Sequence, residues 1–268
     1  MKYVDSHAHY IGRRFDKDRH KLFTDMHKNG VKYIINSTST LELNEGVQLA
    51  KKYDFVYLSL GDGCAYTCGP EGDKYISDEI LDNMIHLAKR NKKIVAWGEN
   101  GIGLNRLELV NGLQNQIYWF KRQLEAAKQV GLPVIIHSRD ACQLVFDILK
   151  DARLPDCGYG KGMLHCFNSS AQMALDYVKM GYLISISGIV TYPSAKHLVE
   201  TVKKVPLEKL LIETDCPYLT PEPHGRKDRN HSGNLKFIVD KIAEIKGIPP
   251  EKVAEATTSN AMSFFNIK

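Results

Sequence analysis

The chain has 268 residues, 43% of them hydrophobic and 25% charged, with a formal net charge of +5. No apolar run approaches the roughly 20 residues that a membrane-spanning helix needs, and the N-terminal segment turns polar too early for the apolar region of a signal peptide. We therefore expect a cytoplasmic protein with no membrane partner. The small positive charge is compatible both with polyanion binding and with an ordinary basic surface.

Short apolar segments alternate with longer amphipathic segments along the whole chain, which favours parallel β/α units. The predicted strands are Tyr3–Ser6, Val31–Asn36, Phe55–Leu60, Ile94–Trp97, Pro133–Ile136, Gly162–His165, Tyr182–Ser187 and Lys209–Glu213. The predicted helices between them include Leu41–Lys52, Asp78–Asn91, Leu113–Val130, Arg139–Lys150, Ala171–Met180 and Ala195–Lys204.

The number of units decides between two α/β architectures. An open, doubly wound sheet would show the same alternation, but eight units favour closure into a (β/α)8 TIM barrel, which typically needs about 250 residues. We predict a single α/β domain over residues 1–268, with extra C-terminal helical turns covering the end of the barrel. These turns are expected at Leu235–Lys246, Glu251–Ala256 and Asn260–Phe264.

Ionisable side chains gather at the carboxyl ends of the predicted strands. His7 and His9 end the first strand and, being two residues apart, leave an extended backbone on the same side. Four more such residues end or follow later strands: Glu99, His137, His165 and Asp215. The carboxyl ends of barrel strands meet on one face, where active sites are built, so we expect these six side chains to converge.

Four imidazoles and two carboxylates exceed the three protein ligands of a single catalytic zinc. They suit two divalent cations roughly 3.5–4 Å apart that share a carboxylate and leave a position for water. A mixed set of this kind accepts Zn²⁺, Mn²⁺ or Mg²⁺. The sequence therefore predicts two divalent cations of undetermined identity.

Six scattered cysteines indicate reduced thiols rather than a disulfide framework. Cys64 and Cys68 resemble half of a zinc site, but no second pair at zinc-finger spacing accompanies them. Cys166 and Cys216 each adjoin a predicted ligand along the chain, so we expect their side chains to point away and pack.

Six motifs, taken together and in order, resemble the TatD family of metal-dependent deoxyribonucleases, within the amidohydrolase superfamily. The likeness spans essentially the whole chain. The motifs are Asp5-Ser6-His7-Ala8-His9, Gly98-Glu99, Val134-Ile135-Ile136-His137-Ser138-Arg139-Asp140-Ala141, Leu164-His165-Cys166-Phe167, Glu213-Thr214-Asp215-Cys216-Pro217-Tyr218-Leu219, and Ser259-Asn260-Ala261 with Phe264.

The resemblance implies a barrel that hydrolyses phosphodiester bonds, often as a 3′-to-5′ exonuclease. Carried over by position, His7 and His9 would bind the first metal together with Asp215. Glu99 would bridge both ions, and His137 with His165 would hold the second.

Two further roles follow from the placement of carboxylates around the predicted ions. Asp215 is placed to accept a proton from a metal-activated water, so we expect it to act as the general base. Asp5 lies one layer deeper on the same strand, where it would orient a ligand rather than act as one.

Two loops depart from the family pattern. Gly61-Asp62-Gly63-Cys64-Ala65-Tyr66 replaces the usual G-x-H-P, and Asn105 stands where the usual G-E-x-G-L-D motif, here stretched, ends in Asp. These changes leave the ligand set intact but affect loops that contact substrate. A hydrolase of a small lactone, amide or phosphoester is therefore the alternative function, and a non-catalytic binder that kept the scaffold is a third.

Arginines are the predicted phosphate contacts, because a guanidinium presents a planar fork to phosphate oxygens. The candidates are Arg139, after the fifth strand, and Arg226 and Arg229 in a basic loop. Tyr218 and Phe167 are equally compatible with stacking on unpaired bases and with barrel packing. We expect a DNA partner, single-stranded or at its 3′ ends, and a monomeric protein.

Overall fold

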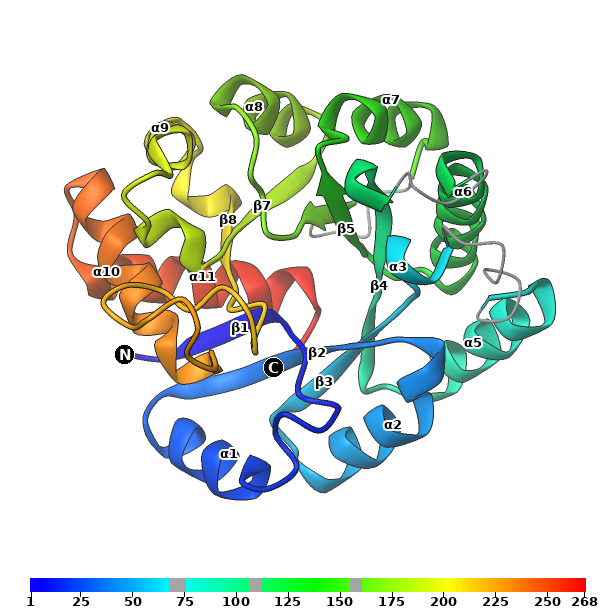
Figure 1. Ribbon diagram of the computed structural model, residues 1–268, viewed down its shortest axis with the longest axis horizontal. Coiled ribbons are helices and arrows are strands. Elements are labelled where there is room, and N and C mark those ends of the chain that lie inside the picture. The colour runs from blue at the N-terminus through cyan, green and yellow to red at the C-terminus, as the bar shows by residue number, and fades with distance from the viewer. Residues whose placement is uncertain (68–75, 107–111, 155–160) are drawn as a thin grey trace.

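The barrel is visible in the computed structural model of the protein, which describes residues 1–67, 76–106, 112–154 and 161–268 (Figure 1). Its strands are all parallel and follow one another around the sheet in sequence order. They are β1 (Tyr3–Ala8), β2 (Val31–Thr38), β3 (Val56–Leu60), β4 (Ile94–Gly103), β5 (Val134–Arg139), β6 (Gly162–Leu164), β7 (Tyr182–Ile186) and β8 (Leu210–Ile212).

Helices surround these strands (Figure 1). They are α1 (Arg19–Lys28), α2 (Leu43–Lys52), α3 (Cys64–Thr67), α5 (Asp78–Arg90), α6 (Gly112–Val130), α7 (Cys142–Ala152), α8 (Ala171–Lys179), α9 (Lys196–Lys204), α10 (Leu235–Lys246) and α11 (Pro250–Phe264). Among the described residues, none of these helices has both the length and the apolar character to span a membrane.

Backbone hydrogen bonds just beyond β8 bring the last strand to the first. The Asp215 N–H donates to the carbonyl of His7 over 3.0 Å, and the His9 N–H donates to the carbonyl of Cys216 over 2.8 Å. The side chain of Ser6 adds a bond to the Ile212 carbonyl over 2.9 Å. The predicted (β/α)8 barrel is confirmed, and its closure places the ends of β1 and β8 side by side.

Three apolar clusters hold the described part of the barrel. The largest lies between the strands and the surrounding helices, where it includes the fully buried Trp97. The second combines one or more residues from β1, β2 and β4 to β8, such as Val4 and Ile135, with Phe264 and Phe265 at the end of α11. The predicted C-terminal cover therefore exists. It meets the strands near their beginnings, because Val4 and Ile135 come early in their strands, and so leaves the carboxyl ends open.

The C-terminal segment differs from the prediction in its continuity. The two turns expected at Glu251–Ala256 and Asn260–Phe264 are a single helix, α11. The threonines between them do not interrupt it, because Thr257 Oγ1 donates to the Val253 carbonyl and Thr258 Oγ1 donates to the Lys2 carbonyl.

Strands β4 and β5 run further than predicted, which moves two of the site residues. Glu99 lies inside β4 rather than after it, at a register shift between Trp97 and Asn100. Arg139 is the last residue of β5, paired with Gly103, and α7 begins only at Cys142. The expected helix start at Arg139 was therefore wrong, because pairing with β4 continues to that residue.

Candidate metal centre

A local distortion of β4 presents Glu99 at the mouth of the barrel. Gly98 and Gly101 flank the register shift with φ values of +133° and +147°, in the region that favours glycine. A Cβ on Gly98 would lie 2.3 Å from the Ile135 carbonyl oxygen, and one on Gly101 would lie 2.0 Å from that of His137. The close approach of β4 to β5 thus requires glycine at both positions.

The first cluster of donor atoms comes from β1 and the segment after β8. The Nε2 atoms of His7 and His9 lie 3.1 Å apart, so the two side chains converge as the H-x-H spacing predicts. Asp215 Oδ1 lies 3.2 Å from His9 Nε2 and 3.6 Å from His7 Nε2. Glu99 Oε2 completes the cluster at 3.3 Å from His7 Nε2 and 3.7 Å from His9 Nε2.

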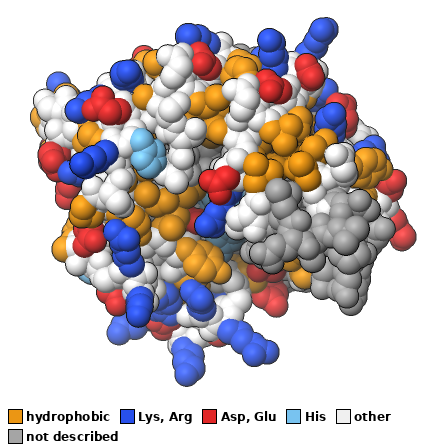
Figure 2. Space-filling view, turned by 45° about the horizontal axis from the view of Figure 1, so that its top comes forward, with side chains coloured by type: hydrophobic (Ala, Val, Ile, Leu, Met, Phe, Trp, Pro, Cys, Tyr) orange, Lys and Arg blue, Asp and Glu red, His pale blue; other side chains and the backbone are white. Residues whose placement is uncertain are grey.

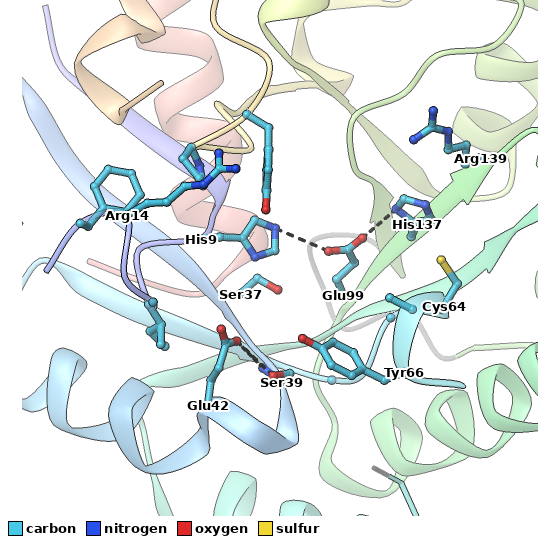
Figure 3. Close-up of a pocket in the computed structure, with 18 of the residues that line it drawn as sticks. His9, Arg14, Ser37, Ser39, Glu42, Cys64, Tyr66, Glu99, His137 and Arg139 are labelled. Carbon is cyan, nitrogen blue, oxygen red and sulfur yellow. Dashed lines mark hydrogen bonds and ion pairs between the residues drawn. The ribbon is translucent and has the colours of Figure 1, made fainter. Parts of the chain in front are cut away.

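The second cluster comes from the ends of β5 and β6. His137 Nδ1 lies 3.1 Å from His165 Nε2. Glu99 Oε1, the other oxygen of the same carboxylate, lies 2.7 Å from His137 Nδ1 and 3.2 Å from His165 Nε2. Glu99 therefore faces one pair of imidazoles with each of its two oxygens, as Figure 3 shows for His9 and His137.

These spacings fit divalent cations. A metal bound at about 2.1 Å in tetrahedral geometry holds its ligand atoms about 3.4 Å apart, and most of the donor distances above lie near that value. Within the described residues, two overlapping triplets bring three donor atoms together: His7 with Glu99 and His165, and His7 with His9 and Asp215. The six side chains predicted as ligands are all in one place.

The electrostatics of the cluster favour a cation. Burial alone would raise the pKa of Glu99, but the His165 charge and hydrogen bonds from the imidazoles around it hold that pKa well below its usual range. Burial is likewise outweighed at Asp215, whose pKa is lowered by the hydrogen bond and charge of His9. Burial and neighbouring imidazoles lower the pKa of His7. At the two carboxylates and His7 the shifts favour the states that bind metal, an ionised carboxylate and a neutral imidazole. Neighbouring carboxylates outweigh burial at His9 and His165 and raise the pKa of both imidazoles, so a bound metal would displace a proton from each.

Glu213 supports His165 from outside the cluster. Its Oε1 accepts from the Nδ1–H of His165 over 3.1 Å and from the backbone N–H of Cys166 over 2.6 Å. The hydrogen on Nδ1 fixes the tautomer in which Nε2 is free to bind metal. The sequence reasoning assigned Glu213 no role, although its position two residues before Asp215, at the end of β8, was a signal.

Asp5 is fully buried beside the first cluster. Its Oδ1 accepts from the backbone N–H groups of Thr214 and His7 over 2.9 and 3.4 Å, and its Oδ2 accepts from the hydroxyls of Thr214 and Ser232 over 2.5 and 2.7 Å. Asp5 therefore fixes the backbone at and beside His7 and Asp215 by accepting hydrogen bonds, none of which comes from an imidazole ring.

The unusual loop after β3 meets the second cluster through Cys64. Burial is outweighed at His137, where the Cys64 thiol and the Glu99 carboxylate raise the pKa of the imidazole to about 9. The loop is anchored from behind, where the Asp62 N–H donates to Gln123 Oε1 and Gln123 Nε2 donates to the Asp62 carbonyl. The replacement of the family's G-x-H-P thus puts a thiol against a predicted metal ligand.

A cavity of about 430 Å³ opens over the cluster. In the space-filling view, histidine lies inside this hollow, with charged side chains at its rim (Figure 2). Among the residues that line it are His9, Glu99, His137, Arg139, Arg13, Arg14 and Tyr218. Arg14 lies over the Tyr218 ring at 5.1 Å. Arg13 and Arg14 were not predicted from the sequence, although both lie in the loop that follows β1, shortly after His9.

The two arginines of the later loop are engaged elsewhere. Arg226 lies over the Tyr192 ring at 4.2 Å, and Arg229 forms an ion pair with Asp18. Neither lines the cavity in the described part of the chain. The structure therefore does not bring these two predicted phosphate contacts to the cavity, because Arg229 ties this loop to the one after β1.

The aromatic side chains considered for base stacking, and the cysteines, can also be located. Phe167 is 4% exposed and packs in the largest cluster, whereas Tyr218 is 51% exposed at the cavity. Cys216 packs in a third apolar cluster, as expected. Four of the cysteines are free thiols, and the remaining two, Cys68 and Cys157, lie outside the described residues.

In this (β/α)8 barrel, imidazole and carboxylate side chains converge at the carboxyl ends of the strands. This combination is typical of metal-dependent hydrolases, the class to which the protein belongs. Comparison with known proteins gives the family. The family model described as TatD related DNase matches residues 4–266, and the chain belongs to this family. The resemblance predicted from the sequence motifs is confirmed.

Relatives and solved structures agree with this assignment. The chain is 33% identical over 264 residues to the Bacillus subtilis uncharacterized metal-dependent hydrolase YabD, covering 98% of both chains. It is 30% identical over 267 residues to human deoxyribonuclease TATDN3, covering 98% of this chain and 94% of the relative. The crystal structure of YjjV, a TatD homologue from Escherichia coli, superposes with a TM-score of 0.88 at 28% identity, covering 99% of this chain and 98% of YjjV.

Proposed function

We propose that this protein is a two-metal hydrolase that cleaves phosphodiester bonds of DNA, acting as a 3′-to-5′ exodeoxyribonuclease on single strands and 3′ ends. The division of the two Glu99 oxygens between two pairs of imidazoles carries the proposal, because one shared carboxylate is what two neighbouring cations require. The name of the human relative, a deoxyribonuclease, supports DNA as the substrate.

Each residue of the cluster has a part in holding the ions. His7, His9 and Asp215 would hold one cation and His137 with His165 the other, while Glu99 contacts both. When bound, such ions lower the pKa of water toward neutrality and offset the charge that develops on a phosphate. Glu213 holds the ring of His165 in the tautomer that this arrangement needs.

Asp215 would act as the general base. Its side chain is 17% exposed, more than that of His7 or His165 in the same cluster, so water can reach it from the cavity. Its lowered pKa keeps it ionised at neutral pH and therefore able to accept a proton.

The scissile strand would enter between two arginines. Arg139 and Arg14 line the cavity on separate elements, and either guanidinium can pair with phosphate oxygens. A cavity of about 430 Å³ lies in the range of small-ligand sites, so it accepts the end of a strand and not a duplex.

The volume of the cavity also favours a second candidate function, the hydrolysis of a small lactone, amide or phosphoester. The altered loop Gly61–Tyr66, which forms part of the cavity wall, is the observation that supports it. A two-metal barrel does not by itself select a substrate.

One experiment separates the two functions. The protein, reconstituted with Zn²⁺, Mn²⁺ or Mg²⁺, is given end-labelled single-stranded and duplex DNA and, in parallel, a panel of lactones, amides and phosphoesters. We expect mononucleotides to be released from the 3′ end of the single strand. Turnover of a small ester with intact DNA would reverse the assignment.

A further inference from the structure

The cavity wall carries charges of both signs. In Figure 3, Arg14 lies on the left and Arg139 on the right, with His9 and Glu99 between them, while Glu42 and Ser39 lie below that pair. An acidic side chain in a cavity for a polyanion is unexpected, because it repels phosphate. Its presence needs a reason.

Glu42 is held in place rather than free in solvent. It ends the short 3-10 helix Thr40–Glu42, where its Oε2 accepts from the backbone N–H of Ser39 over 3.4 Å and from the Ser39 hydroxyl over 3.0 Å. This capping box uses one carboxylate oxygen. The other, Oε1, has no hydrogen-bond partner among the described residues.

A fixed carboxylate with a free oxygen recognises a hydrogen-bond donor. A polynucleotide offers a donor without a charge at its 3′ terminus, where the sugar ends in a hydroxyl. A strand that ended there in phosphate would instead bring two like charges together. The carboxylate on this wall therefore discriminates between strand ends by both attraction and repulsion.

We propose that Glu42, held by Ser39, forms the subsite for the free 3′-hydroxyl of the terminal nucleotide. This inference rests on the proposed nuclease function and specifies which end of the strand occupies the cavity. The terminal nucleotide would place its sugar against Glu42 and its 5′-phosphate at the Glu99 cluster, within reach of the cavity arginines.

This placement of the terminal nucleotide determines which bond is cleaved. The oxygen of a water molecule forms a bond to phosphorus while the bond from phosphorus to the 3′-oxygen of the preceding nucleotide breaks. One proton of the water passes to Asp215, solvent water gives a proton to the departing 3′-oxygen, and Asp215 then returns its proton to solvent. The products are a 5′-mononucleotide and a strand shortened by one unit, whose new 3′-hydroxyl can occupy the same subsite.

The test compares three 5′-labelled single strands that differ only at the last sugar: a 3′-hydroxyl, a 2′,3′-dideoxy end and a 3′-phosphate. kcat and KM are measured with the metal-loaded protein and two variants. In Glu42→Gln the amide keeps the capping box but loses the charge. Glu45→Gln is the matched control, since Glu45 is exposed on α2 and does not line this cavity.

We expect wild type to favour the hydroxyl over the phosphate end by about tenfold or more in kcat/KM, with the dideoxy end between them. Glu42→Gln should reduce the preference over phosphate about tenfold, mainly by lowering KM for the phosphate end, and Glu45→Gln should keep the wild-type ratio. If Glu42 served only to cap the helix, Glu42→Gln would keep the wild-type ratio of kcat/KM between the hydroxyl end and the phosphate end.

The outcomes that overturn the inference are distinct from those that overturn the function. The subsite would be refuted, but not the nuclease function, if wild type cleaved hydroxyl and phosphate ends equally. The same holds if Glu42→Gln kept the wild-type preference between these two ends. Failure to cleave any of the three strands removes the nuclease function and the subsite with it.

Discussion

Replacing Glu213 by Gln tests how the protein supports its predicted ligands. The buried carboxylate contacts the Nδ1–H of His165 and the N–H of Cys166 through Oε1 only. Gln keeps the shape and can keep both bonds, but it loses the charge that raises the basicity of the ring. Loss of such a partner typically costs about 10- to 100-fold in metal affinity or activity, or about 1.4–2.7 kcal/mol.

The same change should leave the stability near that of wild type. Glu213 Oε2 is buried without a hydrogen-bond partner among the described residues, so the Gln amide nitrogen replaces an atom that is already unsatisfied. Because wild type already bears the cost of an unpaired buried polar atom, about 1–3 kcal/mol, Glu213→Gln should remain folded and melt near the wild-type temperature.

The assay for Glu213→Gln is competition for metal with a chromophoric chelator, together with urea denaturation. Glu208→Gln is the control, because Glu208 is exposed in the turn before β8 and far along the chain from His165. Metal affinity of Glu213→Gln equal to that of wild type and of the control would refute the idea that Glu213 sets the state of His165.

Three further predictions concern the base, the phosphate contact and a buried carboxyl. Asp215→Asn should lower turnover by about 10²- to 10⁴-fold with an unchanged circular dichroism spectrum, and equal activity would exclude Asp215 as the base. Arg139→Ala should raise KM for single-stranded DNA and reduce the slope of log affinity against log salt by about one; Arg226→Ala, outside the cavity, should do neither. Burial raises the pKa of Asp62 to about 6 in the folded protein. Between about pH 4 and pH 6 the unfolded chain is ionised at this carboxyl while the folded protein keeps it protonated. The free energy of unfolding therefore falls as the pH rises through this range. Asp62→Asn should remove that loss, at most about 3 kcal/mol, and urea titrations at both ends of this range that show the same pH dependence for variant and wild type would contradict it.

The barrel and the convergence of the six predicted donor side chains could be predicted because both depend on local patterns. Eight apolar segments separated by helical periodicity indicate the strand order directly. The carboxyl end of each strand then determines where His7, His137 and Asp215 lie, since parallel strands in a barrel bring these ends together. No long-range contact had to be known.

The course of β4 could not be read from the sequence. Gly98 and Gly101 resemble signals for the end of a strand, so the predicted strand stops at Trp97. In the structure both glycines instead allow close approach to β5, and the strand continues to Gly103. Only the neighbouring strand distinguishes a bulge from a turn at these positions.

The cavity wall was the least predictable part. Whether an arginine reaches the cavity depends on which loop folds over which, and Arg229 is drawn away by Asp18, more than 200 residues earlier in the chain. Arg14 and Glu42 reach the cavity from loops after β1 and β2, with no motif to mark them. Long-range contacts of this kind leave no periodic signal in the sequence.

Anomalous diffraction from crystals of the metal-loaded protein would count and locate the ions. We expect two peaks roughly 3.5–4 Å apart, with one Glu99 oxygen directed at each. His7, His9 and Asp215 should surround the first peak, and His137 and His165 the second. A single peak, or a metal bound by residues outside this set, would contradict the two-metal proposal.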